Sequence, residues 1–303
     1  MLTKTYSETS LSFATFLSAA AWGMYWFPLR LIESVGISSS WSVVIINACP
    51  MILLIPLFLF TFKNLKLKLK PLFFSALMIG LAITLYANAL VETTVIRATL
   101  LFYLNPILGT VIGLIYLSEQ VTKARLISIF IAMVGLVLLL SESESSTYPL
   151  NIGDFYGLLS GLFWVLGATS LKQAESIPII PLTTLIYGST TLFSIFFASI
   201  IYADITPSIS LILTILPSSL FWSVIVFLPS FMIIFKVSQY LFPGRVGLLM
   251  MSEVIVAIVS ASLLLPSETM ILRQWFGAIA IVGAGVIEVS FSFKQENQIS
   301  EQP

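Results

Sequence analysis

Long, uninterrupted apolar runs are the feature that most limits how this 303-residue chain can fold. Each run is about 20 residues long, which is the length of α-helix needed to cross the hydrocarbon core of a bilayer. Charged residues make up only 9% of the chain, whereas soluble domains contain about 25%. A soluble fold would therefore have to expose an apolar surface. Because the runs are continuous and do not alternate, they predict helices rather than strands of a β-barrel.

Ten such runs predict an all-α polytopic membrane protein with ten transmembrane helices. The runs lie near residues 11–31, 41–62, 71–91, 95–117, 125–141, 154–172, 180–203, 217–238, 246–265 and 273–292. The fifth is short, and residues 207–216 fit either a loop or an additional turn of helix. The N-terminus has no small-residue cleavage pattern, so we expect the first span to be retained.

Basic residues orient the predicted helices, because Lys and Arg are enriched in cytoplasmic loops. With the N-terminus inside, eleven of the fourteen Lys and Arg residues fall on the cytoplasmic side, four of them in the tract KNLKLKLK (63–70). The loop at 141–154 has no basic residue and faces outside. We therefore expect an integral membrane protein with both termini in the cytoplasm.

The residue types that are missing exclude several kinds of chemistry. The chain has no histidine and a single cysteine, Cys49, so it lacks His-based catalysis, His metal ligands and an intrachain disulfide. Its two aspartates, Asp154 and Asp204, lie at span ends and cannot form a buried catalytic pair. There is no phosphate-binding glycine loop, which excludes ATP-driven pumping by this chain. We predict no catalytic residue, metal site or cofactor, and no nucleic-acid partner.

Three pairs of windows indicate an internal repeat. SAAAWGMYWFPLRL (18–31) aligns without a gap with SGLFWVLGATSLKQ (160–173), and this places Trp22 on Trp164. RATLLFYLNPI (97–107) aligns with RVGLLMMSEVI (245–255), which places Asn105 on Glu253. Further on, LSE (117–119) aligns with PSE (266–268). Three matches in the same order are unlike chance similarity between apolar segments.

The repeat divides the chain into residues 1–149 and 150–303, each with five predicted spans. Five is an odd number, so the second unit enters the membrane upside down. Arg30 and Arg97 then lie outside, while their counterparts Lys172 and Arg245 lie inside. Inverted repeats are typical of secondary transporters, in which the substrate binds at the midplane between the two units.

Three motifs carry a resemblance to a known family: WG (22–23), YLNPILGTVIGLIYLSEQVT (103–122) and PGRVGLLMMSEVIVAIVSASLLLPSE (243–268). On these motifs the chain resembles an EamA-type member of the drug/metabolite transporter superfamily, and the resemblance covers residues 11–292. The second repeat departs from the common pattern at Val254, where the family has a proline after the mid-helix glutamate. The resemblance implies a bacterial inner-membrane carrier, most often an exporter of amino acids or related metabolites, and leaves the substrate open.

Helical spacing groups the polar positions of four spans, because residues four apart share a face. The four faces carry Trp22, Trp26 and Arg30; Trp164, Ala168 and Lys172; Arg97, Leu101 and Asn105; and Arg245, Leu249, Glu253 and Ala257. We hypothesise that they line one central cavity. The candidate substrate-binding residues are Trp22, Trp26, Tyr86, Asn88, Tyr103, Asn105, Trp164 and Glu253.

Glu253 is the first candidate, because a charged side chain at the bilayer centre costs about 3 kcal/mol and usually marks function. An apolar environment favours the neutral carboxyl group, so we interpret Glu253 as the candidate proton-coupling residue. The alternative is a structural glutamate that bridges helices. For Arg97 and Arg245, at span ends, snorkelling to the interface is the leading interpretation. Glu119 and Glu268 precede helices, where a carboxylate stabilises the helix N-terminus.

The sequence thus predicts a secondary transporter that moves a small metabolite by alternating access, with export as the expected direction. An importer or an exchanger of the same superfamily remains open, as does the choice between monomer and homodimer. The expected partners are a small-molecule substrate and the lipid bilayer. An intramembrane enzyme is the alternative from a different class, and a purely structural subunit would leave the repeat and Glu253 unexplained.

Overall fold

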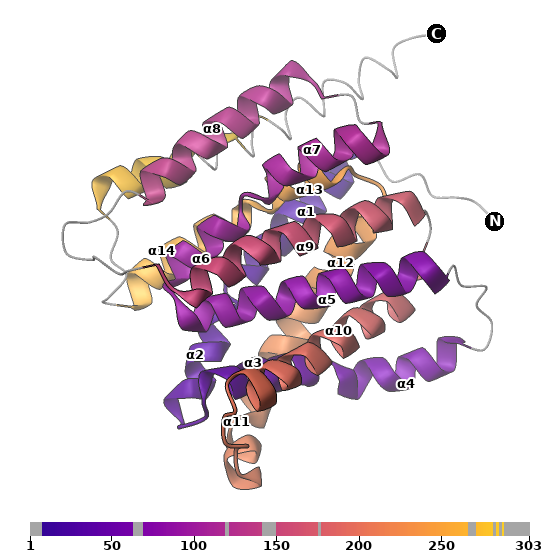
Figure 1. Cartoon of the computed structure of the whole chain (residues 1–303), viewed down its shortest axis with the longest axis vertical. Coiled ribbons are helices and arrows are strands. Elements are labelled where there is room, and N and C mark those ends of the chain that lie inside the picture. Colours follow the sequence, from indigo (N-terminus) through magenta and orange to yellow (C-terminus); the bar gives the residue numbers. More distant parts are fainter. Residues whose placement is uncertain are drawn as a thin grey trace.

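The computed structural model describes residues 8–62, 69–118, 121–140, 150–174, 177–265, 271–280, 283–284 and 287, and all regular structure in these residues is helical (Figure 1). The first predicted unit contains α1 (Glu8–Trp22), α2 (Trp26–Ser34), α3 (Ser39–Ala48), α4 (Met51–Phe62), α5 (Leu69–Glu92), α6 (Val95–Phe102), α7 (Asn105–Leu117) and α8 (Lys123–Leu140). The second contains α9 (Ile152–Ala174), α10 (Ile179–Phe196), η1 (Phe197–Ile201), α11 (Ile209–Leu220), η2 (Phe221–Phe227), α12 (Leu228–Val237), α13 (Pro243–Met250) and α14 (Ser252–Leu264).

Seven stretches of the described residues are long and apolar enough to cross a membrane. They are Ser39–Thr61, Lys70–Glu92, Val95–Leu117, Ile152–Ala174, Ile179–Ile201, Ile209–Val237 and Pro243–Leu264. These coincide with seven of the ten predicted spans. Helices α1 and α2 occupy the first predicted span, α8 occupies the fifth, and the tenth lies partly outside the described residues. Residues 209–216, which the sequence left ambiguous, are helical as part of α11.

Prolines explain several interruptions of these helices, because proline lacks an N–H and its ring clashes with the carbonyl four residues earlier. Pro28 lies in the first turn of α2, just after the turn at 23–25, and Pro106 is the second residue of α7. Pro217 precedes the π-helical stretch η2, a common accommodation of a disturbed hydrogen-bond ladder. The break at Met251 between α13 and α14 has no proline.

The fourth span of each predicted unit is broken in the same way. Helices α6 and α13 have 8 residues each, and α7 and α14 have 13 residues each. The breaks interrupt the four-residue spacing on which the predicted faces depended. Arg97 and Asn105 therefore lie on different helices, as do Arg245 and Glu253. Trp22 and Trp26 are likewise separated by the turn between α1 and α2.

Helix α9 lies at the centre of the bundle, with α5 along one side and α6 and α7 along the other (Figure 1). On the far side α1 packs against α12, α13 and α14, and α7 packs against α13. A Cβ on Gly109 would lie 2.8 Å from the backbone nitrogen of Gly244, so the crossing of α7 and α13 depends on glycine at both positions.

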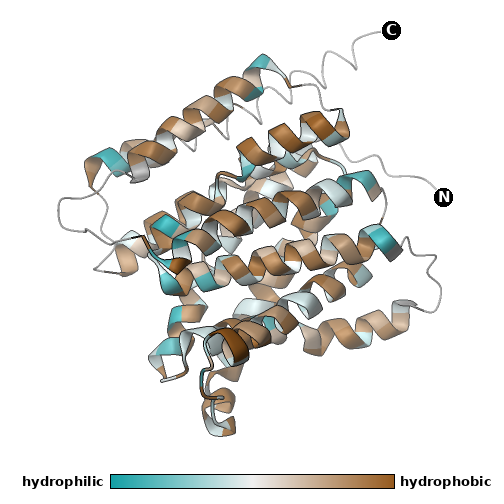
Figure 2. Cartoon of the chain, in the orientation of Figure 1, coloured by the Kyte–Doolittle hydropathy of each residue, from teal (hydrophilic) through white to brown (hydrophobic). Residues whose placement is uncertain are grey.

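Most residues of the helices are hydrophobic, and hydrophilic residues lie mainly toward the helix ends (Figure 2). Phe60, Ile115 and Phe130 have exposed fractions of 83%, 69% and 69%. Contiguous exposed apolar surface of this extent is incompatible with water and fits contact with lipid tails. The chain is therefore an integral membrane protein, and its polar side chains gather at the helix ends and in the interior.

Candidate functional site

Glu253 lies in the first turn of α14 and has no exposed surface. The Tyr86 hydroxyl donates to its Oε1 at 2.7 Å, and the Tyr103 hydroxyl lies 2.5 Å from its Oε2. Tyr86 comes from α5 and also contacts the Thr99 hydroxyl at 3.1 Å, while Tyr103 lies at the break between α6 and α7. Three of the predicted site residues, separated by up to 167 positions, therefore meet in one network.

The contacts of Tyr103 indicate which protonation state this arrangement accommodates. Its hydroxyl oxygen lies 2.6 Å from the Met250 carbonyl oxygen and 2.5 Å from Glu253 Oε2. A phenol has one proton to donate, and a carbonyl can only accept. Both contacts are hydrogen bonds when a protonated Glu253 donates to Tyr103 and Tyr103 donates to Met250. With an ionised Glu253, one of the two short oxygen–oxygen contacts would lack a proton.

Aromatic rings fill the space beside this carboxyl group. The Trp22 ring lies 4.3 Å from Phe231, 5.6 Å from Trp164 and 5.7 Å from Tyr86, measured between centroids. Phe102 packs 4.8 Å from Tyr86. The neighbouring Gly23 lets α1 approach α14, since a Cβ there would lie 2.7 Å from the Glu253 carbonyl oxygen. We call the five rings of Trp22, Tyr86, Phe102, Trp164 and Phe231 the aromatic cluster.

Several buried polar atoms of the described residues have no hydrogen-bond partner. Among them are Nε1 of Trp22, Oδ1 of Asn88, both amide atoms of Asn105 and the hydroxyl of Tyr187. Each of these side chains is no more than 2% exposed. A buried polar group without a partner costs about 1–3 kcal/mol, so such groups usually mark a place for water or a ligand. Three of them, Trp22, Asn88 and Asn105, are predicted site residues.

The other predicted site residue, Trp26, is held differently. Its Nε1 donates to the Ser260 hydroxyl at 3.0 Å and so ties α2 to α14. Arg30, which the four-residue spacing placed on the same face, donates to the Leu90 carbonyl and pairs with Glu33 at 3.0 Å. The sequence did not point to Phe231 or Tyr187, because nothing distinguishes them from the many other aromatic residues of the spans.

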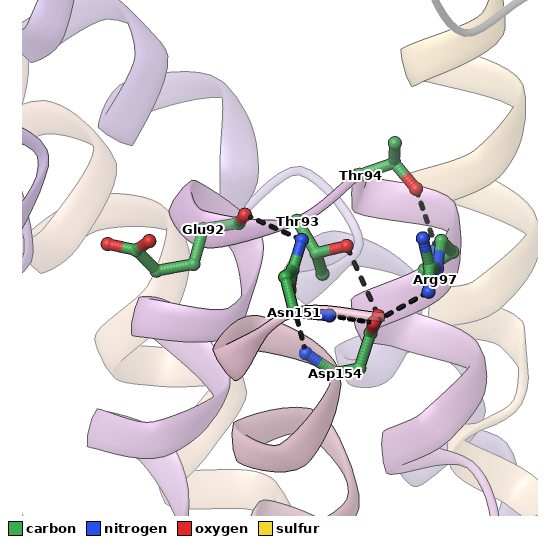
Figure 3. Close-up of polar contacts among 6 residues, drawn as sticks. All are labelled: Glu92, Thr93, Thr94, Arg97, Asn151 and Asp154. Atoms are coloured by element: carbon green, nitrogen blue, oxygen red, sulfur yellow. Dashed lines mark hydrogen bonds and ion pairs between the residues drawn. The ribbon is translucent and has the colours of Figure 1, made fainter. Parts of the chain in front are cut away.

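The two arginines for which snorkelling was expected are both engaged within the protein. Arg97 Nη2 lies 2.6 Å from Asp154 Oδ2, and this ion pair joins α6 to α9 (Figure 3). Asp154 also accepts from the Asn151 backbone N–H at 2.9 Å and from the Thr93 hydroxyl at 3.2 Å. Arg245 is only 8% exposed and donates to the Ser12 hydroxyl at 3.1 Å. Both arginines therefore have acceptors on neighbouring helices within reach, and snorkelling to the interface stays a prediction.

Glu119 and Glu268, which were assigned a structural role at helix starts, lie outside the described residues. Within the described part of the chain, no three His, Cys, Asp or Glu side chains come together in a way that could hold a metal ion. The site shown by these contacts is one carboxyl group and two phenols beside the rings of the aromatic cluster. Such a set can bind a cation, a proton or a hydrogen-bonding ligand.

Comparison with known proteins gives a family match and a shared fold. Residues 9–141 match the EamA-like transporter family. An uncharacterized transporter of Helicobacter pylori (strain ATCC 700392 / 26695) is 30% identical over 126 residues, which cover 40% of this chain and 42% of the relative's length. A protein of known crystal structure has 13% sequence identity and a TM-score of 0.69, over 96% of this chain and 100% of its own. At that identity the likeness concerns the fold alone.

Proposed function

We propose that this chain, whose residues 9–141 belong to the EamA-like transporter family, is a proton-coupled secondary transporter for small metabolites with a protonated amino group. Amino acids and related amines are the substrates that fit best, and the bacterial inner membrane is the proposed location, with both termini in the cytoplasm. The direction proposed is export, the direction that the resemblance of the sequence motifs implies.

The observation that carries this proposal is the environment of Glu253. Its carboxyl group is fully buried, it is hydrogen-bonded to the neutral hydroxyls of Tyr86 and Tyr103, and it is in neither of the ion pairs found among the described residues. A buried carboxylate needs a positive partner. A protonated amine would supply that charge, and the rings of Trp22 and Tyr86 would add cation–π attraction.

Asn105 supports an amino acid over a simple amine. It begins α7, so its amide lies at a helix N-terminus, where the backbone dipole favours an anion. Both of its amide atoms are buried and lack a partner. We propose that Asn105 and the start of α7 receive the carboxylate of the substrate, while Glu253 receives its amino group. The break in the fourth span would thus serve substrate binding, as in other transporters with interrupted helices.

Coupling follows from competition for one carboxyl group. Glu253 can hold a proton, in the arrangement with Tyr103 and Met250 described above, or it can ionise and hold the amine. A carrier that exchanges the two moves substrate against protons. One proton crossing about 100 mV supplies ~2.3 kcal/mol, enough for roughly a 50-fold gradient of substrate.

Packing supports the two inverted five-helix units of the proposed ten-helix architecture. Helix α9 packs on α5, α6 and α7, and its counterpart α1 packs on α12, α13 and α14. Each of these two helices, the first of its own unit, therefore packs against later helices of the other unit. Helices α6 and α13 have equal lengths, as do α7 and α14, and this supports the same correspondence between the two proposed units.

The two arginine contacts extend this correspondence to the ends of the bundle. The gap-free alignment that places Trp22 on Trp164 also places Ser12 on Asp154. Arg97 contacts Asp154, and its counterpart Arg245 contacts Ser12, so the two contacts are repeat partners. We propose that each one joins the two units at one face of the membrane and must separate when that face opens.

Flux in proteoliposomes tests the substrate class. The wild-type protein should accumulate a hydrophobic amino acid or amine when a pH gradient is imposed, and it should not transport the matched compound in which the amino group is replaced by hydrogen. Equal transport of both compounds would contradict recognition by Glu253. Imposing the gradient in either orientation separates an exporter from an importer, and counterflow without a gradient identifies an exchanger.

A further inference from the structure

A groove of about 440 Å³ opens on the outside of the bundle, away from the aromatic cluster. Its walls come from α5 and α7, and α9 forms its floor. The α9 residues that line it include Leu166, Thr169 and Gln173, spaced by three and four positions along one face. At about 100° per residue, that face is directed away from Trp164, so the groove is separate from the proposed substrate site.

One end of the groove is polar. Lys70 lies there in the first turn of the 24-residue helix α5, where the backbone dipole also favours an anion. Thr169 lines the same groove, is only 7% exposed, and its hydroxyl has no hydrogen-bond partner. Gln173, one turn further along α9, adds an amide. A cation, a helix N-terminus and an unsatisfied buried hydroxyl together fit an anionic group with several oxygen acceptors.

The remainder of the groove is apolar and faces the membrane. Phe74 lies one turn beyond Lys70 on α5, and Ile112 and Tyr116 lie opposite on α7. Phe74 is 46% exposed and Tyr116 is 66% exposed, so the groove is open to the lipid side. In the sequence, Lys70 is the last residue of the basic tract 63–70. Basic pockets between transmembrane helices bind anionic lipid head groups.

We propose that this groove binds one anionic phospholipid, with its phosphate at Lys70 and Thr169 and an acyl chain along Phe74 and Ile112. The order of the lining residues, from charged through polar to apolar, follows the order of chemical groups in such a lipid. A water-soluble phosphate compound would have no use for the membrane-facing half of the groove.

Lipid retention by the purified, delipidated full-length protein tests this proposal. Phosphatidylglycerol and phosphatidylcholine are added in equal amounts, and bound lipid is counted by native mass spectrometry. We expect one phosphatidylglycerol to be retained in preference to phosphatidylcholine. Lys70→Gln and Thr169→Val should each weaken its binding about fivefold, the effect of one charge or one hydrogen bond at such a site. Inorganic phosphate at millimolar concentration should not displace it.

Matched controls separate the groove from the general surface. Lys123→Gln removes an exposed lysine at the start of α8, and Thr214→Val removes an exposed hydroxyl on α11, both outside the groove. Both controls should retain lipid as the wild type does. Equal loss in Lys70→Gln and Lys123→Gln, equal retention of the two lipids, or displacement by free phosphate would each overturn the proposal. Since retention is counted on folded protein, the result does not depend on transport.

Discussion

In the proposed mechanism, what Glu253 can bind depends on whether its carboxyl group is protonated and on the hydroxyls of Tyr86 and Tyr103, which contact its two oxygens. Tyr86 and Tyr103 hold the two carboxyl oxygens from different helices, so the position of the carboxyl group depends on both. A carboxyl group fixed in this way can exchange a proton for an amine without a large movement of its own side chain. At the scale of single residues, the tyrosines are therefore positioning residues for the proposed proton and substrate site.

Tyr103→Phe should weaken substrate binding and lower thermal stability. The substitution removes the hydroxyl between Met250 and Glu253 and leaves a buried carbonyl without its donor, at a cost of about 1–3 kcal/mol. We expect the KM for transport to rise about 5- to 100-fold. Tyr116→Phe is the control, because Tyr116 is 66% exposed on α7. Equal KM values in the two variants would show that the Tyr103 hydroxyl has no part in binding.

Asn105→Leu should affect the carboxylate of the substrate and not its amino group. The substitution preserves the approximate size of the side chain but removes an amide that has no partner in the protein. The KM for an amino acid should therefore rise by about tenfold, the effect of one hydrogen bond to a charged group, while that of the corresponding decarboxylated amine should stay unchanged. If both KM values rise equally, Asn105 has a structural role at the start of α7.

Single residues of the site were predictable where their type is unusual for a membrane span. A glutamate, asparagines and tyrosines within apolar runs stand out, and Glu253, Tyr86 and Tyr103 do lie together. Their pairing was not predictable, because contacts across 150 and 167 positions depend on how the helices pack. Phe231 had no distinguishing signal, since phenylalanine is common throughout the chain.

Among the helices, the crossing of α7 and α13 brings the two broken spans into contact. Gly109 and Gly244 lie against each other there, and a Cβ on Gly244 would lie 2.9 Å from the Thr110 backbone nitrogen. Backbone atoms cannot move aside as a flexible side chain can. Small residues at such crossings allow close packing of transmembrane helices.

Gly244→Ala should therefore separate α7 from α13. We expect a loss of about 1–3 kcal/mol in stability, the usual effect of overpacking, and a corresponding loss of transport. Gly188→Ala on α10 is the control, because a Cβ there would meet only the end of Met51 at an ordinary 3.6 Å. Thermal unfolding in detergent gives the comparison. Equal midpoints for the two variants would contradict a role for this crossing in stability.

Helices were predictable from the length of the apolar runs, and the interruptions near Pro28 and Pro106 follow from proline chemistry. The break at Met251 was not predictable, because no proline or glycine pair marks it. From the sequence we expected one continuous helix here, in which the four-residue spacing places Arg245 and Glu253 on one face. In the folded protein their positions depend on two separate helices.

For the whole molecule, the ion pair between Arg97 and Asp154 joins α6 to α9, which belong to different units in the proposed architecture (Figure 3). Asp154→Asn should weaken this contact by about 1–3 kcal/mol and alter transport, since the substitution removes the negative charge that pairs with Arg97 in a partly buried place. The exchanged pair, Arg97→Asp with Asp154→Arg, should recover part of the lost activity. Glu33→Gln is the control, because Arg30–Glu33 lies within one helix and joins no units. Failure of the exchanged pair together with normal transport by Asp154→Asn would contradict a closing role.

Proton-driven flux through Glu253→Gln tests proton coupling most directly. The amide can accept from Tyr86 and donate to Tyr103, so the variant should fold, but it cannot bind or release a proton. In proteoliposomes the wild type should accumulate its amine-bearing substrate when a pH gradient is imposed. Glu253→Gln should accumulate none, whatever the gradient. Accumulation by Glu253→Gln that responds to the gradient as in the wild type would show that protons do not act through this carboxyl group.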